Sequence, residues 1–196
     1  MDKRGYFGQL QEQPVENAGF KRERRLLEAF AKFLKEYSIA KQHLQDQHIL
    51  DAHSHIVAAL HHWARIVLAE CGQEPAQAIW VQLRSVHPGI YKLYEELTAS
   101  PETLQQRVEL ALLASEFSVM SKMKDCCAIV LDILESRKEP WSLEELYKHP
   151  KLEGIEADLA LVMGKLAKRF FIKEVAVMPA SEDPDGLELR YQKAAN

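Results

Sequence analysis

The residue types best suited to chemistry are concentrated in residues 51–66, DAHSHIVAALHHWARI, which contain four histidines, an aspartate and an arginine. Each residue of a helix is turned by about 100° from the one before it. On a helix, the polar residues of this segment would share an arc of roughly 120°, and its large apolar residues would occupy the opposite side. His53 falls on the apolar side. The polar arc comprises Asp51, Ser54, His55, His61, His62 and Arg65.

Two kinds of site fit this polar arc. Imidazole and carboxylate groups bind metals, but only Asp51 and His55 have the spacing of a chelating pair, and His55 and His62 would lie about 10 Å apart along the axis. The small alanines beside the histidines and the arginine instead suit a cleft that admits an anionic or hydrogen-bonding ligand. We therefore expect no metal ligands here. A plain solvated helix surface is the open alternative to a ligand-binding set of Asp51, His55, His62 and Arg65.

Motifs of several reaction classes are absent from the sequence. It contains no GxGxxG, GxSxG or HExxH segment and no CxxC pair. Asp183-Pro184-Asp185 has a spacing that could hold a divalent ion, but no Gly-Ser segment for a triphosphate precedes it. Because Asp and Pro favour turns, a solvated turn is expected there. The sequence therefore predicts no catalytic residue and no cofactor in this chain.

Composition narrows the functional classes further. Lys and Arg number 25 against 29 Asp and Glu, a net charge of -4, which argues against avid non-specific binding of nucleic acid. No run of about 18 apolar residues exists, so no membrane span is expected. Three cysteines without paired spacing and the absence of an apolar secretory leader indicate a reducing cytoplasm.

Apolar residues at helical spacing predict a mainly α fold. Helices are expected at 20–45 and 47–71, and Gly72 is expected to end the second. Two short pieces should follow between Pro75 and Ser100, broken at His87–Gly89. Ser100 is expected to cap a long helix that reaches about Arg137. The core positions predicted on that helix are Leu110, Leu113, Phe117, Met120, Cys127, Val130 and Leu134.

The C-terminal residues follow a different pattern. Ser142 and Glu145 form a capping-box pattern, a second helix is expected at 155–168, and two apolar or alternating stretches flank a polar loop. This order predicts a winged helix-turn-helix with a β-hairpin after an up-and-down helical bundle. The expected domains are a strap at 1–18, a helical bundle at 19–137 and a winged helix-turn-helix at 138–196.

Three phrases, DAHSHIVAALHHWARI, IWVQLRSVHPGIYKLYEEL and EPWSLEELYKHPKL, resemble a family of nucleotidyltransferase-like proteins from Gram-positive bacteria. In that family an N-terminal nucleotidyltransferase-like domain precedes a helical domain of the substrate-binding type and a C-terminal helix-turn-helix. The resemblance is strongest from Ile49 to Leu152. It implies that this chain corresponds to the second and third parts and lacks the first.

The resemblance also implies which part does what. Nucleotidyl transfer needs a Gly-Ser motif and acidic residues for Mg²⁺, so the Mg²⁺ and the nucleotide would belong to the N-terminal domain. The parent protein would then be the nucleotidyltransferase, and this chain alone would not catalyse the reaction. The bundle would hold a small-molecule or nucleotide acceptor in a cleft facing its partner, the N-terminal domain. The residues lining it would be Asp51, His55, His62 and Arg65.

Two other functions remain open, a DNA-binding regulator and a protein-interaction module, each acting through the winged helix. Residues 138–196 contain nine Lys and Arg against eleven Asp and Glu, a net charge of -2. Because phosphate contacts supply much of the affinity of DNA-binding proteins, this charge argues against DNA. Packing of the winged helix on the bundle or on a partner protein is expected instead.

Overall fold

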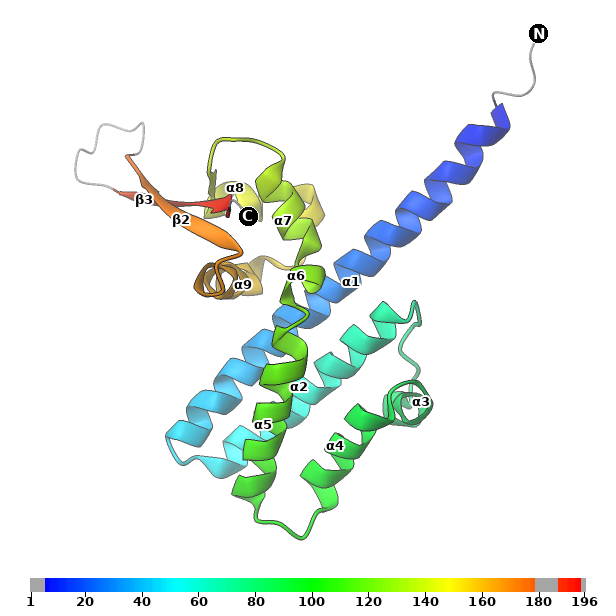
Figure 1. Cartoon of the computed structure of the whole chain (residues 1–196), viewed down its shortest axis with the longest axis vertical. Helices are drawn as coiled ribbons and strands as arrows, with labels where there is room; N and C mark the ends of the chain where they lie inside the picture. Colours follow the sequence, from blue (N-terminus) through cyan, green and yellow to red (C-terminus); the bar gives the residue numbers. More distant parts are fainter. Residues whose placement is uncertain (1–5, 179–186, 195–196) are drawn as a thin grey trace.

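A single long helix, α1 (Tyr6–Gln45), carries the other elements on two of its sides (Figure 1). The computed structural model describes the backbone of residues 6–178 and 187–194, with side chains from residue 18 onward. The further helices are α2 (Ile49–Glu70), α3 (Ile79–Val86), α4 (Pro88–Ala99), α5 (Leu104–Met120), α6 (Met123–Cys126), α7 (Ala128–Glu135), α8 (Leu143–Tyr147) and α9 (Glu156–Lys168). Helices α2 to α5 lie on one side of α1, and α7 to α9 lie on the other.

The core is built on the antiparallel pair of α1 and α2. Both helices place large apolar residues at helical spacing and bury them almost completely, and each such side chain contributes roughly 1.5–3 kcal/mol on burial. A short turn joins the two helices, and Gln47 has a φ of 62° within it. The largest residues of this shared core include Leu27, Phe30, Phe33, Leu34, Tyr37, Ile56, Leu60, Trp63 and Val67.

Helices α3 to α5 close the bundle over α2. The predicted break at His87 is confirmed: His87 ends α3 and caps α4, accepting a hydrogen bond from the Ile90 amide at 3.3 Å. Helix α5 is capped by Thr103, which forms a capping box with Gln106, and the predicted cap at Ser100 is therefore wrong. A Thr with Gln three residues later satisfies two backbone donors reciprocally, which explains the later start.

The long helix predicted up to Arg137 is also wrong, because three helices replace it. The chain turns at Ser121–Lys122 and again at Cys127, where the backbone leaves helical geometry. The Ser121 hydroxyl donates to the Ser118 carbonyl, a local bond that competes with the helical ladder. Of the predicted core positions, these four are buried: Met120, Cys127, Val130 and Leu134.

The other three predicted core positions are wrong. Leu110, Leu113 and Phe117 are 50%, 70% and 83% exposed. Helix α5 instead packs on α2 and α1 through a face that includes the small residues Ala111 and Ser115. Small side chains allow a close approach of the helices, and the larger leucines and Phe117 are left towards solvent.

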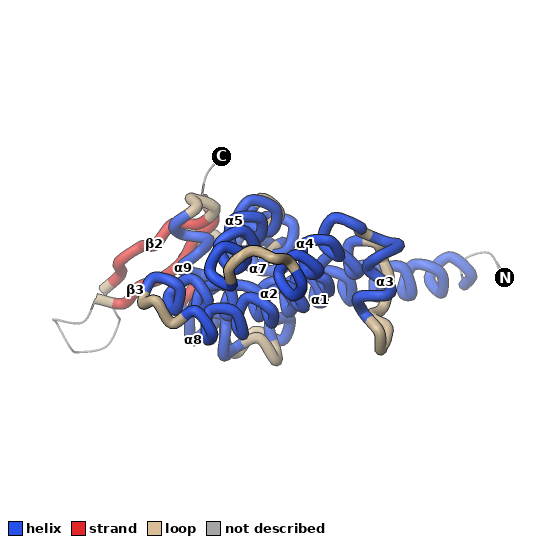
Figure 2. Tube along the Cα trace, turned by 90° about the horizontal axis from the view of Figure 1, so that it is seen from below, coloured by secondary structure: helices blue, strands red, loops and turns tan. Residues whose placement is uncertain are grey.

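The C-terminal part combines short helices with a small antiparallel sheet. Strands β1 (Trp141–Ser142), β2 (Ile172–Val177) and β3 (Glu188–Lys193) form the sheet in the order β1-β3-β2. Ser142 and Glu145 form the predicted capping box at the start of α8, and a 3₁₀ helix (Pro150–Leu152) leads towards α9. Figure 2 shows this sheet at the end of the molecule opposite the N-terminus. The chain is thus mainly helical with a three-stranded C-terminal sheet.

The first predicted helix begins earlier in the structure than in the prediction. Helix α1 begins at Tyr6 and not at Phe20, so it extends into the predicted strap at 1–18. Extending an existing helix adds one hydrogen bond for each residue fixed, without a new nucleus. The predicted turn at Asp183-Pro184-Asp185 lies outside the described residues. Among the described helices, none has the length and apolar character needed to cross a membrane.

Candidate functional site

The principal candidate site is a cleft between α1 and α2, with a volume of about 350 Å³. One face of α1, one face of α2 and the loop after α2 form its walls. The α2 wall contains His62 and Arg65, two of the four predicted ligand-binding residues. The complete lining is Arg25, Glu28, Ala29, Lys32, His62, Arg65, Ala69, Gln73, Glu74 and Pro75.

The charges around the cleft are not fully compensated. Its three cationic side chains, Arg25, Lys32 and Arg65, face two carboxylates. Arg25 pairs with Glu74, and Glu28 pairs with Arg24 outside the cleft. Among the described side chains, neither Lys32 nor Arg65 forms an ion pair. The cleft therefore has two exposed cations available for an anionic ligand.

Buried nitrogen atoms add to this polarity. The Nδ1 of His62 and the Nε of Arg25 are inaccessible to solvent and have no hydrogen-bond partner in the described part of the chain. Burial lowers the pKa of His62, and the positive charges of Arg65 and Lys32 lower it further. A neutral imidazole can donate a hydrogen bond to a ligand or accept one from it. The two cations beside it would neutralise the negative charge of that ligand.

The other two predicted residues lie elsewhere along α2. His55 is half-buried, and its Nδ1 lies 2.7 Å from the Glu36 carboxylate of α1. Asp51 is exposed in the first turn of α2. From Asp51 to Arg65 the helix rises about 21 Å, at 1.5 Å per residue. The structure therefore brings His62 and Arg65 together and separates both from Asp51.

The remaining members of the polar arc have local partners. Trp80 donates its indole N–H to Nε2 of His61 at 3.3 Å and stacks on Tyr94 with ring centroids 3.8 Å apart. Ser54 donates to the Leu50 carbonyl within α2. Burial is the main cause of the lowered pKa of His61. The contacts of His61 with Trp80 and Tyr94 join α2 to α3 and α4, so His61 serves as a packing residue.

Several polar residues of the α1–α2 seam were missed from the sequence. The prediction from the sequence assigns no role to Lys32 and Glu36 of the first helix, or to His43 and His48, which flank the turn. The sequence contains part of the information needed to find them. Arg25, Lys32, Glu36 and His43 recur at intervals of seven, four and seven residues, which places them on one side of α1. Which helix that side faces could not be read from the pattern.

Comparisons with known proteins identify the family of the helical part of the chain. Residues 23–122, which include the whole cleft lining, match the YgxA-like substrate binding domain. The uncharacterized protein YgxA of Bacillus subtilis (strain 168) is 34% identical over 143 residues, covering 73% of this chain and 48% of that protein. This chain thus spans about half the length of that curated relative.

A solved structure is similar to this chain over its whole length. The crystal structure of a nucleotidyltransferase-like protein from Exiguobacterium sibiricum 255-15 is 27% identical, with a TM-score of 0.85. The similarity covers 100% of this chain and 67% of that chain. By the match of residues 23–122, this chain belongs to the family of proteins that contain a YgxA-like substrate binding domain.

Proposed function

We propose that the α1–α2 cleft binds an anionic group, phosphate or carboxylate, of an acceptor substrate for nucleotidyl transfer. The observation that carries the proposal is the meeting of Lys32, Arg65 and His62 in one cleft, with neither cation in an ion pair among the described residues. The buried, unpartnered nitrogens of His62 and Arg25 cost free energy that a ligand would offset, and the two exposed cations would attract its negative charge. Arg65 would hold the anion by paired N–H donors, and Lys32 would act as a point charge.

Catalysis is assigned in this proposal to a different domain. A nucleotidyltransferase-like domain, N-terminal to these residues in the full protein, would hold the nucleotide and Mg²⁺, and the helical part would present the acceptor to it. The name of the Exiguobacterium structure and the coverage of 48% of YgxA support a longer parent protein. The intact mass of the native protein tests this point. A mass larger by a domain of roughly 100 residues or more supports it, and a mass near 22.5 kDa contradicts it.

The C-terminal part is proposed to be a winged helix that packs within the protein. The sheet order β1-β3-β2 around α7, α8 and α9 supports the assignment. The helix that would enter a DNA groove, α9, packs on α1, where Lys35 lies 3.5 Å from Asp158. At its C-terminal end Arg169 lies 4.0 Å from Glu116 of α5.

The contact of Arg169 with Glu116 brings part of the basic end of α9 towards the bundle, while Lys168 is exposed. Lys165, one turn before Arg169, is partly buried, and this burial and the positive charge of Arg169 lower its pKa. We therefore expect no binding of random duplex DNA at moderate salt. Tight, sequence-specific binding of a duplex would overturn this assignment in favour of a DNA-binding regulator.

The cleft proposal is tested with phosphate compounds as probes. Inorganic phosphate and AMP are titrated into the full chain, and the pKa of His62 is followed by NMR. A bound anion between Lys32 and Arg65 counteracts the charges that lower this pKa, so the pKa of His62 should rise. Arg65→Ala should weaken probe binding by about 10- to 100-fold, because a hydrogen bond to a charged group contributes about 1.5–3 kcal/mol.

A matched control is available on the surface. Arg84 is an exposed arginine of α3 outside the cleft, so Arg84→Ala removes the same charge from the chain without changing the site. Its probe affinity should equal that of the unsubstituted chain. Equal loss of affinity in both variants would mean that net charge alone attracts the probe, and the cleft proposal would fail.

A further inference from the structure

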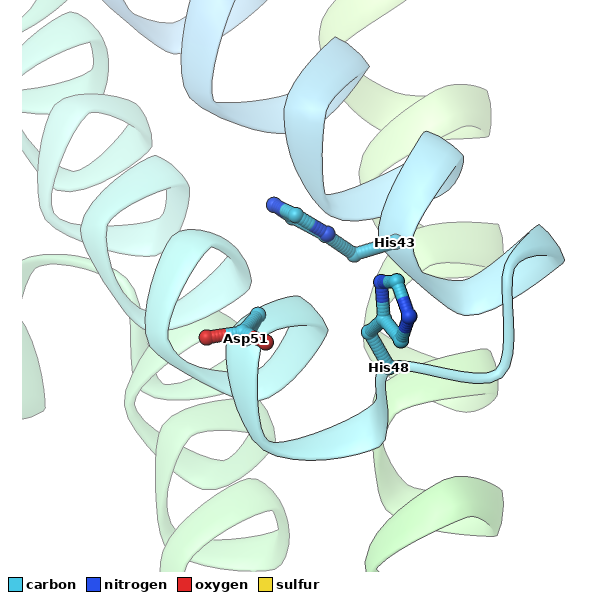
Figure 3. A group of neighbouring side chains, drawn as sticks. All are labelled: His43, His48 and Asp51. Atoms are coloured by element: carbon cyan, nitrogen blue, oxygen red, sulfur yellow. The ribbon is translucent and has the colours of Figure 1, made fainter.

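A second group of side chains with ligand chemistry lies at the turn between α1 and α2. Figure 3 shows His43 from the end of α1, His48 from the turn and Asp51 from the first turn of α2. One ligand atom from each residue lies within 4.8 Å of the other two. We propose that His43, His48 and Asp51 bind one divalent transition-metal ion, and zinc is the metal with which the site is tested.

The backbone of the turn holds the three residues in place. Gln47 has a φ of 62°, which reverses the chain within a few residues. The His48 amide donates to the His43 carbonyl at 2.8 Å, and the Ala52 amide donates to the His48 carbonyl at 2.9 Å. His43 and His48 are thus connected by a direct main-chain bond, and Asp51 follows in the first turn of α2. The cluster thus lies at the facing ends of two helices and in the turn between them.

The ligand set points to a particular class of metal. Two imidazoles and one carboxylate suit zinc, cobalt, nickel or iron, whereas magnesium and calcium prefer oxygen ligands alone. A tetrahedral zinc with bonds near 2.1 Å holds its ligand atoms about 3.4 Å apart. Rotations of the side chains would close the present separations of up to 4.8 Å. His48 and Asp51 are exposed, so the ion has access from solvent and a water can complete the coordination.

The three side chains have little other bonding to give up. The Nδ1 of His43 is inaccessible to solvent and has no hydrogen-bond partner among the described residues. His48 is the N-cap residue of α2, but its side chain makes no capping bond. Asp51 forms no ion pair within the described part of the chain. A metal ion at this cluster would therefore break no side-chain hydrogen bond among the described residues.

Neighbouring residues orient the cluster from one side. The His43 ring stacks on His55 with centroids 5.4 Å apart and an angle of 18° between the planes. His55 is in turn held by the Glu36 carboxylate at 2.7 Å. This stacking restricts the rotation of the His43 ring. His55 is assigned here a positioning role, and it is not counted among the ligands.

This site is separate from the cleft of the proposed function. Asp51 and His62 are eleven residues apart on α2, which is about 16 Å along the helix axis. A metal at the turn would connect the ends of α1 and α2 and would stabilise the folded chain by mass action. The proposal goes beyond acceptor binding and can be tested without any substrate.

The experiment measures zinc binding to the full chain after removal of metals with a chelator. Calorimetry should give one zinc per chain, and cobalt in place of zinc should give the visible absorption of a low-coordinate ion. His48→Ala and Asp51→Asn should each weaken zinc binding by at least about tenfold, since loss of even an outer-shell partner costs about 10- to 100-fold. Zinc should raise the melting temperature of the unsubstituted chain more than that of His48→Ala.

Matched controls lie within the same segment. His53→Ala and Asp46→Asn remove the same chemical groups at positions outside the cluster and should bind zinc normally. Cys71→Ser removes the exposed thiol and should leave the affinity unchanged. The proposal is overturned if the unsubstituted chain binds no zinc, or if His48→Ala binds it as tightly. It is also overturned if His55→Ala loses binding while His43→Ala retains it, since Asp51 and His55 would then be the chelating pair.

Discussion

Two neighbouring leucines of α5 provide the most direct test of how the bundle is packed. Leu112 is 6% exposed and Leu113 is 70% exposed, although they are the same residue type on the same helix. The apolar pattern of the sequence predicts Leu113 as the core position. Replacing each leucine by alanine in a separate variant therefore compares the predicted and observed orientations of α5.

The expected free-energy losses follow from burial. Leucine to alanine removes three carbon groups, each contributing about 0.8 kcal/mol when fully buried, so transfer alone gives about 2.4 kcal/mol. At Leu112 the cavity left behind adds to this transfer contribution, for a total loss of up to about 5 kcal/mol. At Leu113 only a third of the contribution applies, about 0.7 kcal/mol, and the higher helix propensity of alanine offsets a few tenths of it.

Thermal and urea unfolding followed by circular dichroism at the helical band measure both variants. For a chain of this size, each kcal/mol shifts the melting temperature by about 2–4 °C. Leu112→Ala should lower it by about 5–20 °C, and Leu113→Ala by no more than about 2 °C. Equal shifts, or a larger shift for Leu113→Ala, would mean that α5 is rotated relative to the description above.

Two further predictions concern ionisable groups. The ion pair with Arg137 and the Ser142 amide bring the pKa of Glu145 to about 2, below its unfolded value, so this carboxylate contributes stability above the unfolded pKa. That contribution disappears as the pH falls towards 2, and Glu145→Gln should therefore show a smaller loss of urea midpoint between neutral and acidic pH; an identical loss would refute the role of Glu145. Among the thiols, Cys71 is exposed, whereas burial raises the pKa of Cys126 to about 12 and that of Cys127 well above its usual value. A thiol reagent should modify one thiol per native chain and three per unfolded chain, and rapid native labelling of all three would contradict this burial.

Elements with strong local signals were predicted well from the sequence. The capping box of Ser142 and Glu145, the break at His87 and the glycine after α2 each depend on residues close together in the chain. Gly72 has a φ of 68°, a conformation that favours glycine at a helix end. Such signals act over one turn, so they can be recognised before any tertiary contact is known.

The orientation of α5 could not be predicted in the same way. The apolar residues of α5 are distributed around the whole helix, so a helical-wheel projection shows more than one apolar side. The choice between Leu112 and Leu113 depends on the fit of Ala111 and Ser115 against the facing helices, which is a property of packing between distant segments. Burial of the small residues and exposure of Phe117 contradict the simple rule that the largest apolar side chains lie inside.

The histidine-rich arc of α2 illustrates the same distinction for function. The helical period predicts the direction in which a side chain points from the helix axis. It does not predict which residue of a neighbouring helix that side chain contacts. Along α2, His62 and Arg65 meet Lys32 in the cleft, His55 meets Glu36, and Asp51 approaches two histidines at the turn. Because α1 presents a different group at each level, one arc of similar residues supports different chemistry along its length. The cleft and the turn should therefore be treated as separate sites, and substitutions in one should leave ligand binding at the other unchanged.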